Sequence, residues 1–210
     1  MKQGLFITFE GADGCGKTTQ LSKISDLLTE KGYDVVTTRE PGALEVGTKI
    51  RDIVLHHTGV VSDKCEMFLY LADRSQHVDT FIRPMIEEGK IVLCDRHTDS
   101  TIAYQGYGRG RDITLLKDLN NIATSGFKPD LTILFDVDTE IAQTRVGSEK
   151  DRLEAAGIEF HKKVRNGYLE LASKEPERIK IVNANNSIEN VYNDTKTIII
   201  NLLKDKCHEE

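Results

Sequence analysis

Three things are scarce in this sequence: long apolar runs, closely spaced cysteines and net positive charge. The longest apolar runs are far too short to cross a bilayer, so we expect no membrane span. Cys15, Cys65, Cys94 and Cys207 form no Cys-x-x-Cys pair and no histidine-rich cluster, which argues against zinc and fits reduced thiols in the cytosol. A net charge of −6 argues against general nucleic-acid binding, so an anionic ligand must be held by locally gathered arginines.

The rest of the composition is that of a globular protein, with 39% hydrophobic and 30% charged residues. A chain of 210 residues is long enough for one α/β domain with a substantial core, so we expect a single domain over residues 1–210. The first residues, MKQGLF, lead almost at once into an apolar run and leave no room for a signal peptide. We therefore expect a cytoplasmic protein.

The stretch LFITFEGADGCGKTT, residues 5–19, has a residue spacing that demands a ligand. Residues 11–18 match G-x-x-x-x-G-K-[ST] between an apolar run and a helical pattern, a context that favours a phosphate-binding loop over a chance glycine turn. Backbone N–H groups and the helix dipole would attract phosphate, Lys17 can reach the β and γ phosphates, and Thr18 can ligate Mg²⁺. The predicted loop residues are Gly11, Ala12, Asp13, Gly14, Cys15, Gly16, Lys17, Thr18 and Thr19.

Five short apolar runs alternate with helical patterns and are predicted to be strands: residues 5–9, 35–38, 91–94, 131–135 and 179–182. Their β-branched content without strict alternation indicates strands buried on both faces, as in a parallel sheet covered by helices. The predicted fold class is therefore doubly wound α/β. In such a sheet ligands bind outside the carboxyl ends of the strands, so the residues just after each strand are candidate site residues.

Two arginines follow the second predicted strand. Arg39 precedes Glu40-Pro41-Gly42, whose proline and glycine enforce a turn, so we expect Arg39 to project into the ligand crevice; the alternative is a solvated loop arginine. In the next predicted helix, residues 46–55, Arg51 lies among apolar residues. Its position alone favours a salt-bridged surface residue over a second phosphate clamp.

Residues 63–77 predict a helix that begins with a capping box formed by Asp63 and Glu66. Tyr70 and Arg74 are four residues apart, so an aromatic ring and a guanidinium share one face. One interpretation is a site for a planar base, on which Tyr70 stacks while Arg74 donates to an exocyclic oxygen. The other places Tyr70 in the core and lets Arg74 reach out to water. Spacing alone leaves the two interpretations even.

Two predicted strands end in an acid suited to the magnesium of a nucleotide, Asp95 and Asp136. We favour Asp95, because the adjacent Arg96 can bridge two phosphates in the transition state, whereas Asp136 precedes a polar helix start where an acid often caps. We expect His97 to be structural. Residues 98–110, TDSTIAYQGYGRG, are rich in hydroxyl, amide and glycine groups, which indicates a binding loop.

Residues 145–157, RVGSEKDRLEAAG, interrupt two helical patterns with dense charge. They resemble a mobile lid that carries Arg145, Lys150 and Arg152, and an ordinary solvated charge run has equal weight. An amphipathic helix is predicted over residues 160–171. After the last strand, residues 183–187 form either a turn that borders an adenine or an ordinary loop that ends in a helix cap.

Taken together, the motifs FEGxxGxGKTT, TREPG, LxADRxQH, LCDRHxDSTxAYQGxGRG, PDLTxxxDV and NAxxSIENV resemble those of the thymidylate kinase family. The similarity covers essentially the whole chain, and AYQG and REPG are far more specific than the phosphate loop. The resemblance implies a P-loop nucleoside-monophosphate-kinase fold with a five-stranded parallel sheet between helices, and a homodimer. It also implies phosphorylation of dTMP to dTDP with MgATP, a step in making dTTP.

The resemblance further implies roles for single residues. Residues 11–18 match the ATP phosphate loop and Arg145 lies beside the adenine, while Thr18 and Asp95 lie at the magnesium. Arg39 and Arg51 match arginines of the acceptor phosphate, Arg74 meets thymine O4, and Tyr104 crowds the sugar 2′ position. The implied dTMP-binding residues are Asp13, Arg39, Arg51, Tyr70, Arg74, Arg96, Thr101, Tyr104 and Gln105, and the implied catalytic residues are Lys17, Asp95, Arg96 and Arg152.

Three residues depart from the family pattern. Tyr70 stands where phenylalanine is common, so its hydroxyl needs a partner. Ala43 follows REPG where a second glycine is usual, which puts the backbone of that turn in question. Gly14 replaces the loop arginine of some members, so the chain resembles the bacterial type that takes its catalytic arginine, here Arg152, from the lid.

The expected reaction is in-line transfer of the ATP γ-phosphoryl group to a dTMP phosphate oxygen. The second pKa of a phosphate monoester is about 6, so the acceptor is largely ionised at neutral pH and needs no general base. Two alternatives stay open: another nucleoside or nucleoside-monophosphate kinase, and a nucleotide-dependent switch protein. No Asn-Lys-x-Asp guanine-reading motif is present to support the switch.

Overall fold

The computed structural model describes residues 4–147 and 151–208. The strands are β1 (Leu5–Glu10), β2 (Val35–Arg39), β3 (Ile91–Asp95), β4 (Leu131–Asp136) and β5 (Ile179–Asn183). The α-helices are α1 (Lys17–Glu30), α2 (Glu45–His56), α3 (Asp63–His77), α4 (Arg83–Glu87), α5 (Thr98–Thr101), α6 (Ile113–Thr124), α7 (Thr139–Arg145), α8 (Ile158–Lys174) and α9 (Ile188–His208). Two π-helical segments, η1 (Val78–Ile82) and η2 (Ile102–Gly108), and one 3₁₀ turn, η3 (Glu154–Ala156), complete the described elements.

The five strands form one parallel sheet in the order β2-β3-β1-β4-β5, which confirms the expected α/β fold. Each strand extends one residue beyond its predicted carboxyl end, because the ladder continues through the polar residue that follows the apolar run. Asp95, for example, is in register with Phe9 on one side and Arg39 on the other. These terminal polar residues therefore lie side by side at the end of the sheet formed by the carboxyl ends of the strands.

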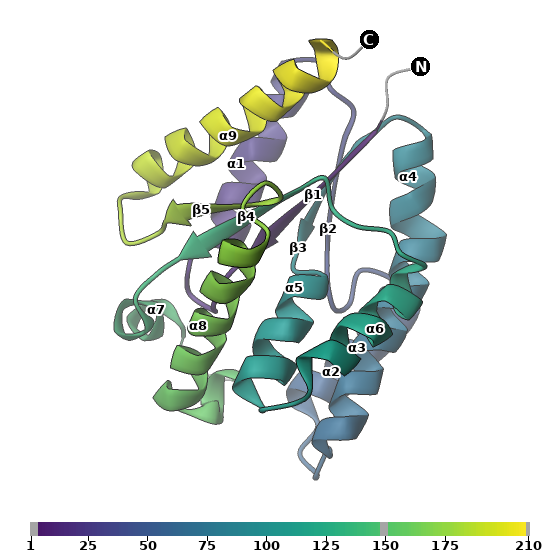
Figure 1. Ribbon diagram of the computed structural model, residues 1–210, viewed down its shortest axis with the longest axis vertical. Coiled ribbons are helices and arrows are strands. Elements are labelled where there is room, and N and C mark those ends of the chain that lie inside the picture. Colours follow the sequence, from purple (N-terminus) through teal and green to yellow (C-terminus); the bar gives the residue numbers. More distant parts are fainter. Residues whose placement is uncertain (1–3, 148–150, 209–210) are drawn as a thin grey trace.

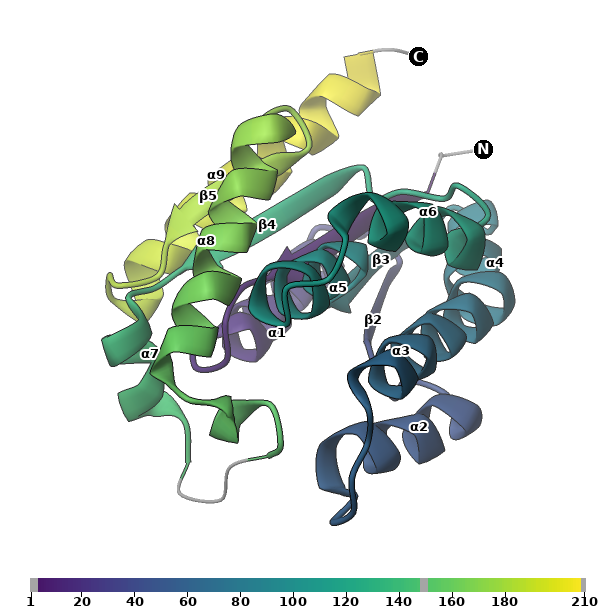
Figure 2. The same ribbon diagram turned by 60° about the horizontal axis from the view of Figure 1, so that its bottom comes forward.

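Helices cover both faces of the sheet (Figure 1). Helices α1 and α9 pack together on one face, and α8 packs against the η2 segment on the other. When the view is turned, α7 lies on one side of the carboxyl ends of the strands, and α2 with α3 lies on the opposite side (Figure 2). The carboxyl ends of the strands, which carry the polar residues, thus lie between these helices.

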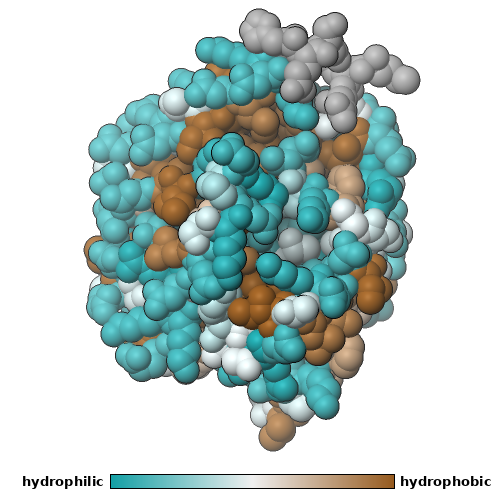
Figure 3. All heavy atoms as spheres, viewed as in Figure 1, coloured by the Kyte–Doolittle hydropathy of each residue, from teal (hydrophilic) through white to brown (hydrophobic). Residues whose placement is uncertain are grey.

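On the face seen in Figure 3, hydrophilic residues cover much of the surface, and hydrophobic residues gather in smaller groups. Among the described residues, no helix combines the length and the apolar character that a membrane span requires.

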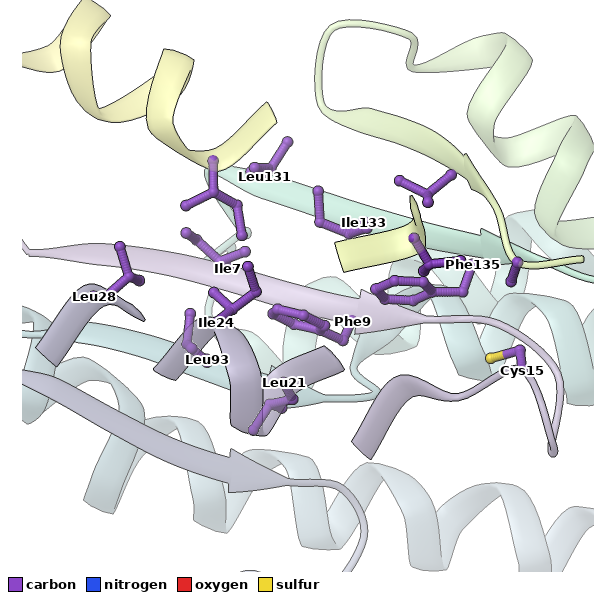
Figure 4. Close-up of a cluster of buried hydrophobic side chains, with 14 of the residues drawn as sticks. Ile7, Phe9, Cys15, Leu21, Ile24, Leu28, Leu93, Leu131, Ile133 and Phe135 are labelled. Carbon is purple, nitrogen blue, oxygen red and sulfur yellow. The ribbon is translucent and has the colours of Figure 1, made fainter. Parts of the chain in front are cut away.

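The strand β1 is buried on both faces, as its unbroken apolar run predicts. Ile7 and Phe9 pack toward α1, where they meet Ile24 and Leu28, and Phe135 of β4 stacks on Phe9 with ring centroids 5.7 Å apart (Figure 4). Phe6 points to the other face and joins a second cluster with residues of η1 and β3. This double burial anchors the strand whose end leads into the phosphate loop.

The start of α3 differs from the predicted capping box. Ser62 is the N-cap, and its side chain accepts a hydrogen bond from Cys65 N at 3.3 Å. Asp63 and Glu66 do not form a box, because Glu66 is fully buried and contacts residues of other elements. The spacing Ser-Asp-x-x-Glu allowed either start, and the burial of Glu66 explains the outcome.

Candidate active site

A cavity of about 900 Å³ lies at the carboxyl ends of the strands. Its walls come from the phosphate loop, the ends of β2 and β3, helices α2 and α3, the η2 segment, the end of α7 and the turn after β5. This volume is near the upper end of the range of volumes found for ligand pockets, so the cavity has room for more than one small ligand. The predicted site residues that line it are Asp13, Gly14, Cys15, Gly16, Lys17, Thr18, Thr19, Arg39, Arg51, Tyr70, Arg74, Asp95, Arg96, Thr101, Tyr104, Gln105 and Arg145.

The phosphate loop depends on glycine backbone. Gly11, Gly14 and Gly16 all have positive φ, at 141°, 79° and 93°. A Cβ atom at Gly14 would lie 2.4 Å from the Ala142 carbonyl oxygen, so the loop arginine of some family members has no room here. A Cβ at Gly16, the N-cap of α1, would meet nothing within 4 Å. The loop is thus held from behind and open toward the cavity, as a phosphate cradle must be.

Lys17 begins α1 and is almost fully buried. Its Nζ donates to the Gly11 and Ala12 carbonyl oxygens at 3.0 and 3.1 Å, and lies 3.6 Å from the Cys15 Sγ. These contacts hold the ammonium group across the mouth of the loop, which explains why Gly11 and Ala12 support the site without lining the cavity. A phosphate in the loop would meet this charge together with the backbone N–H groups.

The residues at the end of β3 fit a magnesium ion. The Thr18 hydroxyl donates to Asp95 Oδ2 at 3.3 Å, so the two predicted ligands lie together. Asp95 Oδ1 is buried and has no hydrogen-bond partner within the described residues. A hard cation takes oxygen ligands of this type. The rival acid Asp136 is paired with Arg165 through two bonds of 2.6 and 2.9 Å, which leaves Asp95 as the better candidate.

Arg96 occupies the centre of the cavity wall. Its φ of 70° places a non-glycine residue in the left-handed region, and its guanidinium donates to Asp13 Oδ1 at 2.5 Å, to the Tyr104 hydroxyl at 3.1 Å and to the Gly11 carbonyl oxygen at 3.1 Å. Tyr104 in turn donates to Asp13 Oδ2 at 2.8 Å. Burial alone would raise the pKa of Asp13, but Arg96 and Lys17 hold it well below its usual range.

Glu10, which the sequence did not single out, organises the loop after β3. Its buried carboxylate accepts hydrogen bonds from His97 N at 2.7 Å, from the Ser100 hydroxyl at 2.6 Å and from the Tyr168 hydroxyl at 2.9 Å. Burial and the nearby Asp99 raise the pKa of Glu10 to about 7. The last residue of β1 thereby positions the chain that follows Arg96.

Arg39 and Arg51 face the cavity from β2 and α2. Arg51 donates to the Pro41 carbonyl oxygen at 3.0 Å, and burial and the nearby Arg39 lower the pKa of Arg51. Two neighbouring guanidinium groups that repel each other make a favourable place for a phosphate. The surface interpretation of Arg51, which its position in the sequence favoured, is wrong for this structure, since Arg51 is half-buried and lines the cavity.

Arg74 is 2% exposed and therefore does not reach out to water. It donates through Nε to Glu40 at 2.8 Å, through Nη1 to Thr101 and Asn120 at 2.7 Å each, and through Nη2 to the His97 carbonyl oxygen at 2.8 Å. A guanidinium has five N–H donors, so these four bonds leave one at Nη2. Tyr70, Thr101 and Gln105 line the same part of the cavity, and burial raises the pKa of Tyr70.

Tyr70, Arg74, Thr101 and Gln105 form what we call the base-binding wall of the cavity. Glu40 holds Arg74 in place in this wall and is thus its anchor, and the sequence analysis missed it. Its buried carboxylate accepts from Arg74 on Oε2 and from both His77 and His97 on Oε1, each at 3.0 Å. Burial alone would raise the pKa of Glu40, but His97 and Arg74 hold it well below its usual range. The structural role expected for His97 fits this contact. The turn after Glu40 contains Gly42 at φ 102°, whereas Ala43 has no positive φ, so Ala43 fits the turn.

The turn after β5 borders a further part of the cavity. Arg145, at the end of α7, donates to the Ala184 carbonyl oxygen at 3.0 Å. Arg145, Ala184 and Ser187 all line the cavity here. An adenine beside this turn was one of the two alternatives that the sequence left open, and it stays a prediction.

The lid residue Arg152 does not line the cavity. Its Nη2 pairs with Glu66 Oε2, its Nε donates to the Val54 carbonyl oxygen at 3.1 Å, and its backbone N donates to Leu55. In this structure the buried Glu66 carboxylate attracts the guanidinium away from the cavity, so a role of Arg152 at the phosphates stays a prediction. Lys150, the other lid cation considered, lies outside the described residues.

A phosphate loop with lysine, hydroxyl and acid at one end of a cavity, and arginines beside an aromatic ring at the other, defines a P-loop phosphotransferase that acts on nucleotides. Comparison with known proteins gives the same class. The family model described as thymidylate kinase matches residues 9–195. A relative named thymidylate kinase from Maridesulfovibrio salexigens is 45% identical over 95% of this chain and 97% of its own length.

Other relatives agree. The thymidylate kinase of Clavibacter sepedonicus is 47% identical over 86% of this chain and 87% of its own. A crystal structure of thymidylate kinase from Ehrlichia chaffeensis has a TM-score of 0.77 and 34% identity, covering 93% of this chain and 98% of that one. The chain belongs to the thymidylate kinase family, whose members are phosphotransferases.

Proposed function

We propose that this protein transfers the γ-phosphoryl group of ATP to dTMP and releases dTDP. The observation that carries the proposal is one continuous cavity with the phosphate loop at one end and Tyr70, Arg74 and Gln105 at the other. Arg96 is bonded to Asp13 of the phosphate loop. Two nucleotides placed from opposite ends would bring their phosphates together at Arg96.

On the donor side, Lys17 and residues 11–19 bind the ATP phosphates, and Arg145 lies beside the adenine. Thr18 and Asp95 hold Mg²⁺, which neutralises phosphate charge when bound. On the acceptor side, Arg39 and Arg51 hold the dTMP phosphate in line with the donor. Charge neutralisation and alignment then suffice, because the acceptor is already largely ionised at neutral pH.

The acceptor nucleoside is selected by the remaining residues. Asp13 accepts a hydrogen bond from the 3′-hydroxyl group, since a carboxylate that faced ATP phosphates would be repelled. Tyr104 is fixed beside Asp13 by its 2.8 Å bond and crowds the 2′ position, which favours deoxyribose. Arg74 donates its free Nη2 hydrogen to thymine O4, while Tyr70 stacks on the base and Thr101 and Gln105 meet its edge. The amino group of cytosine would oppose the Arg74 donor.

Arg152 joins the phosphates only if its pair with Glu66 opens when nucleotides bind. We keep residues 145–157 as a lid in the proposal, within a single domain of residues 1–210. The support is that Arg152, in the segment between α7 and α8, is bonded to α2 through the carbonyl oxygens of Val54 and Leu55.

A coupled assay with purified protein, MgATP and a panel of dTMP, dUMP, dCMP, AMP and thymidine tests the function. We expect dTMP to consume ATP fastest. Faster turnover of another acceptor would indicate a different monophosphate or nucleoside kinase. Slow hydrolysis with every acceptor would favour a switch protein.

We also propose a homodimer. Phe68 on α3, and Leu115 and Ile122 on α6, are 53%, 52% and 72% exposed, and the two helices pack side by side. Light scattering of Phe68→Asp with Ile122→Asp should show a monomer if this face joins two copies. A cytoplasmic location is proposed from the buried free thiols of Cys15 and Cys94, which suit a reducing compartment. The net charge of −6 supports small-molecule substrates and no nucleic-acid partner.

A further inference from the structure

Glu66 lies one layer behind the cavity, in a position that controls Gln105. It is 0% exposed and does not line the cavity, while Gln105 is 3% exposed and does. The Gln105 Nε2 donates to Glu66 Oε1 at 3.2 Å. On the other oxygen, Glu66 Oε2 pairs with Arg152 and lies 3.6 Å from Arg109 Nη2. The carboxylate is thus enclosed by donors on both sides.

This arrangement fixes which way the Gln105 amide faces. A carboxylate accepts hydrogen bonds and cannot donate them, so the Gln105 group that faces Glu66 must be the NH₂. Because the amide is planar, its carbonyl oxygen is then on the branch away from Glu66. A free glutamine would turn to present either group, and the hydrogen bond to Glu66, made within the described part of the chain, removes that choice.

The Gln105 carbonyl oxygen is then a fixed hydrogen-bond acceptor beside the Arg74 donor. This pair of groups matches the base edge of thymine and uracil but not that of cytosine. Thymine and uracil present a donor at N3–H next to the acceptor O4, whereas cytosine presents an acceptor at N3 next to an amino donor. A site whose polar groups cannot reorient leaves those groups unpaired with the wrong base, and this rejects it strongly.

We infer that Glu66 is a positioning residue that selects N3–H pyrimidines by locking the Gln105 amide with its carbonyl oxygen toward the base. The inference rests on the proposed function and deepens it. Glu66 touches no substrate and acts through Gln105. Its second oxygen, bound to Arg109 and Arg152, holds the carboxylate in place.

Glu66→Gln tests this directly, because an amide at position 66 can accept as well as donate and so frees Gln105 to turn. The measurement is kcat/KM for dTMP divided by kcat/KM for dCMP. We expect this ratio to fall by about tenfold or more, the equivalent of one lost hydrogen-bond discrimination. Arg109→Gln is the matched control, since it removes a partner of Oε2 and leaves the bond from Gln105 to Oε1. Its ratio should stay within about twofold of that of the unsubstituted protein, because Arg152 still pairs with Glu66 Oε2.

A double-variant cycle separates positioning from general damage. With Gln105→Ala present, adding Glu66→Gln should leave the ratio unchanged, because the group that Glu66 orients is gone. The inference is overturned if the ratio is unchanged in Glu66→Gln, falls equally in Arg109→Gln, or falls further in the Gln105→Ala background. Should Glu66→Gln fail to fold, Glu66→Asp keeps the charge but shortens the reach to Gln105, and an unchanged ratio there overturns it as well. Failure of the unsubstituted protein to use dTMP would instead refute the proposed function.

Discussion

Replacing Glu40 by glutamine removes one negative charge from an enclosed cluster and leaves the side-chain shape nearly unchanged. Glu40 and Arg74 have side chains 3% and 2% exposed, and their atoms are 2.8 Å apart. The glutamine amide can still accept from Arg74 with its carbonyl oxygen, and its NH₂ can face the two histidines if their rings change tautomer. What it cannot replace is the charge that compensates the Arg74 guanidinium.

Removing one partner of a buried ion pair costs about 3–5 kcal/mol, because the other charge is left without compensation. The remaining amide contact places the expected loss at the lower end, about 3 kcal/mol. For a chain of this size each kcal/mol corresponds to about 2–4 °C, so Tm should fall by about 10 °C. Arg74 would also lose its fixed position, so we expect KM for dTMP to rise more than KM for ATP.

Urea unfolding and thermal melts at pH 7 measure this loss, and Glu45→Gln is the matched control. Glu45 pairs with Lys49 at 3.2 Å, but the two side chains are 88% and 75% exposed. A surface pair of this kind contributes about 0–1 kcal/mol. A loss below about 1 kcal/mol in Glu40→Gln, or a loss equal to that of Glu45→Gln, would refute the assignment of Glu40 as the anchor of the base-binding wall.

The pH dependence gives a second check on Glu40. The pKa of Glu40 is lower in the folded protein than its ordinary value of 4.5, so the folded state favours the ionised form. The stability that this provides is complete above about pH 4.5 and is lost as the pH falls toward the folded pKa. The difference in unfolding free energy between the two proteins should therefore narrow below pH 4.5, and a constant difference down to pH 3 would contradict the charge argument.

Three further predictions concern Arg96 and Thr18, which line the cavity, and Glu10, which is buried behind Arg96. Arg96→Ala should lower kcat at least about 100-fold with a smaller change in ATP affinity by calorimetry, and an unchanged kcat would remove Arg96 from the mechanism. Thr18→Val removes one proposed magnesium ligand, so half-maximal activity should require about tenfold more Mg²⁺, and an unchanged titration would argue against that site. Glu10, with its pKa raised from 4.5 to about 7, binds a proton more readily when folded, so it makes stability fall by up to about 3 kcal/mol as pH rises from 4.5 to 7. Glu10→Gln should lack this component in urea unfolding measured across that range, and an identical pH slope would refute it.

The parts of the site that the sequence predicted are those whose cause lies within a few residues. The phosphate loop follows from glycine spacing, and the structure gives Gly11, Gly14 and Gly16 the positive φ that this spacing requires. Asp95 and Arg39 follow from their place at strand ends, since parallel strands deliver their carboxyl ends to one edge. Arg74 and Tyr70 were placed on one face by helical periodicity, although periodicity could not tell a base-binding face from a core face.

The parts that it missed depend on partners far away in the chain. Glu10, Glu40 and Glu66 are all acids with ordinary neighbours in sequence, and each is buried by a contact with residues at least 34 positions away. A charged residue can be buried only if opposite charges or donors meet it, and the sheet order that brings them together is not written in local spacing. One signal was available for two of them: Glu10 and Glu66 each stand beside an apolar run, where an unpaired charge would be costly, whereas Glu40 stands between Arg39 and Pro41.

Arg152 is a further case in which a contact with a distant residue could not be predicted from local sequence. Its sequence context, a charged segment between two helices, is equally compatible with a lid over phosphate and with a solvated run. In the structure its guanidinium pairs with Glu66, the same carboxylate that holds Gln105. If Arg152 moves to the phosphates when nucleotides bind, Glu66 keeps Arg109 as its remaining partner on Oε2. The charge of the Glu66 carboxylate would then still be compensated by Arg109, and Gln105 would keep its orientation. Closing of the lid would therefore leave the selectivity for the base unchanged.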